Sequence, residues 1–92
     1  MINIIESRYI KDFKVQLLFE ISDYKADKKE QVQKEADFRE YIMAKKETGV
    51  FAPLKDVEFF KNFRLNANTI EWANGADIAP EIIYELAESK KI

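Results

Sequence analysis

The chain contains no cysteine and no histidine among its 92 residues. Without cysteine it can form no disulfide and carry out no thiolate chemistry. Without histidine it lacks the commonest general base, the usual imidazole metal ligand and the side chain that titrates nearest to neutral pH. Its serines have neither a histidine nor a cysteine with which to form a nucleophilic pair. We therefore expect no enzymatic activity and no cofactor.

Glycine, clustered positive charge and long apolar runs are also scarce. The 2 glycines cannot build a glycine-rich phosphate loop. The 15 basic and 17 acidic residues are interleaved, so that no basic face for nucleic acid is visible. No apolar stretch approaches the ~20 residues that span a bilayer, and MINIIESRY does not have the pattern of a secretory leader. We expect a cytoplasmic protein that binds neither nucleic acid nor membrane.

Acidic residues occur in pairs that could serve acid–base or metal chemistry. Asp23 with Asp27, and Glu35 with Asp37, lie close enough in sequence to meet. Lysines stand near both pairs, which is typical of a solvated charged surface. The residues DYKAD around Asp23 lack the alternating oxygen ligands, central glycine and closing glutamate of a calcium loop. We therefore predict no metal site.

Alternating hydrophobicity is the clearest structural signal that is present. In FKVQLLFEI, from Phe13 to Ile21, every odd position is apolar, as expected for a strand with one face in the core. Isoleucines at positions 2, 4 and 10 alternate less regularly upstream. Lys11-Asp12 can reverse the chain, so an N-terminal antiparallel hairpin is the simplest interpretation.

The charged segment over residues 22–47 permits two interpretations. Its Lys, Glu, Gln and Ala favour one long helix, but its apolar residues do not share one helical face. The alternative is a strand from Gln31 to Phe38 and then a short helix that stops near Thr48-Gly49, with Gly49 in the left-handed C′ position. The residues directed at the core are then Val32, Ala36, Phe38, Tyr41 and Ile42.

Caps and spacing predict the elements of the second half. Asp56 is a candidate N-cap for one or two helical turns that bury Val57, Phe60 and Phe63. A second strand pair, joined at Asn66-Ala67-Asn68, contains Leu65, Ile70 and Trp72. Pro80 suits the first position of a C-terminal helix, which has Lys90-Lys91 late and a buried stripe of Ile82, Ile83 and Leu86.

These elements predict one α+β domain over residues 1–92. It has a small antiparallel sheet of about four to five strands, from an N-terminal and a C-terminal hairpin, and two or three short helices, the last of them C-terminal.

The stretch TIEWANGADIAPEIIYEL, residues 69–86, holds the only tryptophan of the chain. A two-residue turn at Asn74-Gly75 would place Asp77 opposite Trp72 on the apolar face, where an unpaired charge is costly. A three-residue turn over Ala73–Gly75 instead places Trp72 opposite Ala76. It also gives Gly75 a left-handed position, which glycine favours.

This register gives Asp77 a structural role. Its side chain would face outward opposite Glu71, where the two carboxylates repel each other. We expect Asp77 to accept hydrogen bonds from N–H groups around Ala79 to Glu81 and so to hold the corner before Pro80.

The same residues resemble a known bacterial family. GVFAPLKD at Gly49–Asp56 and TIEWANGADIAPEIIYE at Thr69–Glu85 are similar to the signature of domain-of-unknown-function family 2442. Ala73 stands where that family would have proline, and the charged stretch from Ser22 to Gln31 replaces a tight turn. The resemblance implies an α+β fold and no established activity. It also implies that stand-alone members act as antitoxin-like partners of a neighbouring small protein.

We carry two functional hypotheses forward. The first is a non-enzymatic protein-interaction or regulatory module, which binds a partner protein or associates with itself through its sheet edges. The second is a small-ligand-binding domain that uses the aromatic region around Phe51 and Trp72. The candidate interaction residues of the signature are Phe51, Trp72, Asn74, Gly75, Asp77 and Tyr84.

Overall fold

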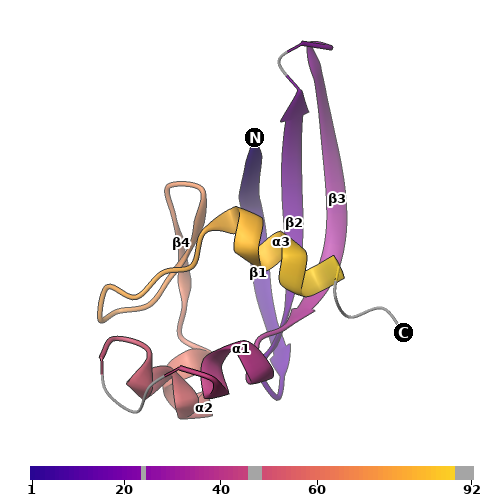
Figure 1. Cartoon of the computed structure of the whole chain (residues 1–92). Helices are drawn as coiled ribbons and strands as arrows, with labels where there is room; N and C mark the ends of the chain where they lie inside the picture. Colours follow the sequence, from indigo (N-terminus) through magenta and orange to yellow (C-terminus); the bar gives the residue numbers. More distant parts are fainter. Residues whose placement is uncertain (24, 46–48, 89–92) are drawn as a thin grey trace.

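The structure, a computed structural model, describes residues 1–23, 25–45 and 49–88 and begins with a three-stranded antiparallel sheet (Figure 1). Strands β1 (Ile2–Lys11), β2 (Lys14–Asp23) and β3 (Lys28–Asp37) lie side by side in sequence order. The alternating strand predicted from the sequence is confirmed as β2. Its fully buried side chains are Val15, Leu17 and Phe19.

The turn between β1 and β2 lies one residue later than predicted. Asp12 and Phe13, rather than Lys11 and Asp12, occupy it, with φ of 51° and 68°. Such positive angles match the right-handed twist of the flanking strands but are strained for a phenylalanine. The Phe13 side chain is nevertheless buried, with its ring 5.0 Å from that of Phe60. Burial of this ring offsets the backbone cost.

The charged segment forms a strand followed by a short helix. β3 begins at Lys28, earlier than the predicted Gln31, so the charged residues lengthen the β2–β3 hairpin beyond the end of β1 (Figure 1). Ala36 and Phe38 are buried and Val32 is half-buried, as expected for one face of a strand. The single long helix is therefore wrong, because the alternation of apolar residues outweighs the helix propensity of Lys, Glu and Gln.

Helix α1 (Arg39–Met43) is shorter than predicted. It buries Ile42 and ends at its C-cap, Ala44, whose N–H bonds back to the Glu40 carbonyl. Gly49 does have a positive φ of 99°, but it is not the residue that ends α1. Its carbonyl instead accepts a hydrogen bond from the Ala52 N–H and so begins the next turn of the chain. Thr48, the other residue at the predicted stop, lies outside the described residues.

The predicted cap at Asp56 is confirmed. The 3-10 helix η1 (Ala52–Lys55) leads into helix α2 (Val57–Phe60), and the Asp56 carboxylate accepts a 3.0 Å hydrogen bond from the Glu58 N–H. Phe60 is fully buried and Val57 and Phe63 are half-buried. The helix thus packs the face that its spacing predicted.

The second hairpin is a separate two-stranded sheet. It consists of β4 (Arg64–Asn66) and β5 (Thr69–Glu71), and the Asn68 carbonyl at its tip accepts a 2.9 Å hydrogen bond from the Ile4 N–H of β1. The five strands therefore form two small antiparallel sheets. The hairpin lies beside the outer edge of β1 (Figure 1).

Helix α3 (Pro80–Glu88) crosses one face of the three-stranded sheet (Figure 1). Ile83 is buried and Leu86 is half-buried, as predicted, but Ile82 is 39% exposed. The reason is that Pro80 starts the buried stripe, and helical periodicity continues it through Ile83 and Ala87 rather than Ile82. Lys90 and Lys91 lie outside the described residues.

Phe60 lies at the centre of the core. Its ring packs against five aromatic rings that come from both halves of the chain, at centroid distances of 5.0 to 6.2 Å. These rings belong to Tyr9, Phe13, Phe38, Phe63 and Trp72. Phe60 thus joins the N-terminal sheet to the second hairpin.

We predict that Phe60→Ala lowers the free energy of unfolding by about 3 to 5 kcal/mol, because it removes a fully buried ring and leaves a cavity. The half-buried neighbour Phe59 supplies the control, and Phe59→Ala should cost clearly less. Urea denaturation followed by circular dichroism measures both values. Equal losses for the two variants would contradict the central position of Phe60.

Candidate functional site

The turn at the centre of the signature has the predicted geometry. The Trp72 N–H donates to the Ala76 carbonyl at 2.8 Å, and the Gly75 N–H donates to the Trp72 carbonyl at 2.9 Å. Gly75 has a φ of 89°, and Glu71 pairs with Asp77. The three-residue turn and its register are confirmed.

Trp72 belongs to the core rather than to an exposed surface. Its side chain is fully buried, and its indole N–H donates to the Phe60 carbonyl at 2.7 Å. The rings of Phe60 and Phe63 lie 5.5 and 6.2 Å from the indole. A small ligand could reach Trp72 only by displacing these rings.

Asn74 connects the turn to the loop before η1. Its side-chain amide donates to the Val50 carbonyl at 2.8 Å, and its Oδ1 accepts from the Ala76 N–H at 3.2 Å. Next to Val50, the half-buried Phe51 ring meets the Tyr41 ring edge to face. The two stretches that carry the family resemblance, GVFAPLKD and the tryptophan turn, are therefore in direct contact.

The Lys45 ammonium lies over this pair of rings. Its Nζ is 4.4 Å from the centroid of Tyr41 and 5.1 Å from that of Phe51. The Lys45 carbonyl accepts a 2.9 Å hydrogen bond from Lys55 Nζ. Two aromatic faces that could bind a cationic ligand are thus occupied by a lysine of the chain itself.

Asp77 does not make the predicted tie between strand and helix. It is exposed, and no hydrogen bond joins its carboxylate to the N–H groups of Ala79 to Glu81 among the described residues. The buried Thr69 holds the corner instead, since its hydroxyl donates to the Ile78 carbonyl at 2.5 Å. An exposed carboxylate is well hydrated, so it gains little from a local backbone bond.

Tyr84 lies apart from the other candidate residues. On α3 it packs edge to face on Phe19 of the sheet at 5.1 Å, and Lys34 Nζ lies 5.7 Å from its ring centroid. The structure thus brings Phe51, Asn74 and Gly75 to one region, buries Trp72, exposes Asp77 and places Tyr84 on the sheet. The ligand site proposed around Phe51 and Trp72 stays a prediction.

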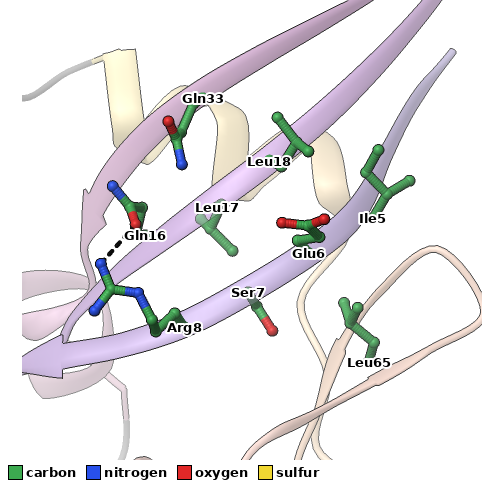
Figure 2. A pocket seen from close by; sticks show the side chains of 9 residues that line it. All are labelled: Ile5, Glu6, Ser7, Arg8, Gln16, Leu17, Leu18, Gln33 and Leu65. Atoms are coloured by element: carbon green, nitrogen blue, oxygen red, sulfur yellow. Dashed lines mark hydrogen bonds between the residues drawn. The ribbon is translucent and has the colours of Figure 1, made fainter.

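A hollow of about 400 Å³ lies on the sheet face opposite α3 (Figure 2). The Arg8 guanidinium donates to Gln16 Oε1 across it at 2.8 Å. Its lining comes from all three strands of the sheet and from β4. The lining residues are Ile5, Glu6, Ser7, Arg8, Gln16, Leu17, Leu18, Gln33 and Leu65.

Three apolar residues around this hollow were absent from the sequence-based candidates. Leu65 is 40% exposed, and Leu18 and Ile5 are half-buried. A register shift between Ile4 and Glu6 leaves Ile5 as an extra residue of β1, and such a bulge re-aims a side chain. Leu18 did carry a signal, because it is an apolar residue at an even position of a strand that buries its odd positions. The bulge at Ile5 had no comparable signal.

The part of the chain that the structure describes contains no group of three acidic side chains placed to hold a metal ion. Within the same residues, no helix is both long and apolar enough to cross a membrane.

The fold and its signature turn define a small α+β domain of two antiparallel sheets with a C-terminal helix. A family model described as "Protein of unknown function (DUF2442)" matches residues 32–89, which is more than half of the chain. The chain belongs to this family. No curated protein and no solved structure matches it.

We predict that Gly75→Ala destabilises the protein by about 1 to 2 kcal/mol, because alanine is strained at positive φ. The cost is conformational rather than steric, since no described residue beyond Gly75 and its two chain neighbours has an atom within 4 Å of where a Cβ would stand. Gly75→Asn is the matched control and should cost less, because asparagine tolerates this region. Thermal unfolding of the three proteins provides the comparison. A Gly75→Ala protein as stable as the parent would show that the turn is not formed.

Proposed function

We propose that this chain is a cytoplasmic, non-enzymatic protein-interaction module, and that its partner is a small protein encoded beside it. The observation that carries the proposal is the group of apolar side chains on the solvent-facing side of the sheet. Ile5, Leu18 and Leu65 stand there around the hollow of Figure 2, on the face that α3 does not cover.

The composition of this face supports a protein partner over a small molecule. Protein interfaces have an apolar centre and a polar rim, and arginine is enriched in them. Here Arg8, Gln16 and Gln33 surround the apolar residues. Small-ligand sites instead enclose most of their ligand in a cleft. The hollow lies on the surface of a sheet, where a protrusion of another protein can enter it.

The side chains around the hollow also support binding without catalysis. Among the described residues that line the hollow, Ser7 alone carries a hydroxyl, and the sequence supplies neither histidine nor cysteine to activate it. Glu6 stands close to Arg8 in β1, and the chain as a whole carries a formal charge of -2. Both features favour a protein over a nucleic acid as partner.

The antitoxin-like role rests on the resemblance of the sequence. The matched family is itself described only as a protein of unknown function. Such a role requires a stable complex with the neighbouring gene product, so the complex is the property to test first.

Co-expression with the adjacent gene product, followed by purification through one tag, should recover both proteins. We predict that Leu18→Gln weakens this complex at least about tenfold, which corresponds to ~1.4 kcal/mol of binding free energy. Isothermal titration calorimetry measures the affinity, and circular dichroism confirms that the variant is folded.

Ile82→Gln is the matched control, because Ile82 is an exposed isoleucine on α3, across the sheet from the hollow. It should bind as the parent does. Failure of the two parent proteins to co-purify would remove the proposed partner. Equal binding by Leu18→Gln and the parent would remove the proposed surface.

A further inference from the structure

The two edges of the three-stranded sheet differ. The second hairpin lies beside β1 and bonds to Ile4. β3 is the last strand at the other side, and no described strand pairs with its outer edge (Figure 1). Exposed edge strands carry unpaired N–H and C=O groups on which another strand can assemble.

The register shows which residues of β3 present these groups outward. The Phe38 N–H donates to the Phe13 carbonyl, so residue 38 directs its backbone toward β2. The pairing of β2 with β3 continues from Lys14 to Asp23 without a register shift. Because strand orientation alternates with a period of two, the even residues of β3 face β2. Lys29, Gln31, Gln33 and Glu35 therefore direct their backbone groups away from β2, toward the outer edge of β3.

The charges along this edge strand are complementary to those of a second copy that runs in the opposite direction. Residues 29–35 read KEQVQKE, with Val32 at the centre and a glutamine on each side. Two positions from Val32, Glu30 on one side is matched by Lys34 on the other. Three positions from Val32, Lys29 is matched by Glu35. We propose that β3 pairs antiparallel with β3 of a second copy of this chain, with Val32 on the two-fold axis.

In this register every charged residue of the stretch lies opposite a residue of the other sign. Lys29 meets Glu35 of the second copy, and Glu30 meets its Lys34, each twice by symmetry. Opposite-charge pairs across strands are stabilising, and like-charge pairs are destabilising. A charged edge usually prevents association, whereas this pattern favours one specific partner, namely itself.

Other symmetric registers are less favourable. Only axes that pass through a residue of β3 let outward-facing groups of one copy meet those of the other. An axis at Gln31 places Lys28 opposite Lys34, and an axis at Gln33 places Val32 opposite Lys34. Axes at Glu30 or Lys34 place that charge opposite itself. Val32 is the centre that avoids all of these pairings.

The two faces of the strand also suit this arrangement. Val32, half-buried on the α3 side, meets its own copy across the axis and loses solvent contact. Lys34 can meet Glu30 of the second copy while its ammonium stays near the Tyr84 ring. α3 crosses the half of β3 nearer to α1, so the two-fold axis places the two helices on opposite halves of the joined sheet (Figure 1).

Charge reversal in the full chain tests the interface. The parent should be a dimer in sedimentation velocity over a concentration series. Lys29→Glu and Glu35→Lys should each raise the dimer dissociation constant about tenfold, because each replaces two attractive pairs by two repulsive ones. An equimolar mixture of the two variants should form a heterodimer with close to the parent's affinity, because every pair is then again of opposite sign.

Lys11→Glu and Glu58→Lys make the same changes of net charge away from the β3 edge, at the end of β1 and on α2, so both should dimerise as the parent does. The mixture also separates loss of the interface from loss of folding, because misfolded variants would not reassociate. A parent that is monomeric at all concentrations overturns the proposal. So does a dimer that is insensitive to both reversals, or a mixture that fails to associate.

Amide hydrogen exchange measured by NMR reports the strand pairing itself. The N–H groups of Gln31 and Gln33 should become protected as the concentration rises, while that of Val32, bonded to β2, is protected throughout. Protection of Gln31 and Gln33 that is independent of concentration would contradict the pairing. This outcome does not depend on the partner protein proposed above, because the edge pairing uses the outward backbone groups of β3. The apolar side chains around the hollow come from β1, β2 and β4, although Gln33 belongs to both surfaces.

Discussion

The contact between Trp72 and Phe60 is the constraint on which the rest of the structure depends. The indole N–H is fully buried and reaches the Phe60 carbonyl at 2.7 Å, while the two rings pack at 5.5 Å. A buried N–H without a partner would cost about 1 to 3 kcal/mol. The helix that carries Phe60 and the strand end that carries Trp72 must therefore lie close together. Phe60 in turn contacts rings from the N-terminal sheet, so one side chain aligns both halves.

The signature of the family follows from this contact. Once Trp72 faces the core, the next inward position in the hairpin is Ala76, and the chain must reverse between them. A three-residue turn with a positive φ at Gly75 makes that reversal. The Asn74 amide then binds the Val50 carbonyl and attaches the GVFAPLKD loop to the turn. The distinctive residues thus stabilise the packing of separate elements.

Sequence reasoning succeeded where the period of the pattern was unambiguous. The alternation in β2, the cap at Asp56 and the parity argument at Trp72 each depend on neighbours within a few residues. The errors came from longer-range effects. Ile82 is exposed because the packing of α3 on the sheet buries the face that carries Ile83 and Ala87. Thr69, not Asp77, holds the strand-to-helix corner. The hollow was missed because a bulge in β1 brings Ile5 beside Leu18 and Leu65, and no local pattern predicts that.

The three surfaces of the N-terminal sheet have separate physical roles. One face is covered by α3 and buries Val15, Leu17 and Phe19, so it can accept no partner without unfolding. The family match starts at residue 32, within β3, so the hairpin that supplies these three side chains lies before it. The helices and strands within the match therefore pack against a sheet whose buried side chains come mostly from β1 and β2, which lie outside the match. The open face and the β3 edge are not covered by α3, and they carry the two interfaces proposed above: apolar side chains around the hollow on the first and self-complementary charge on the second.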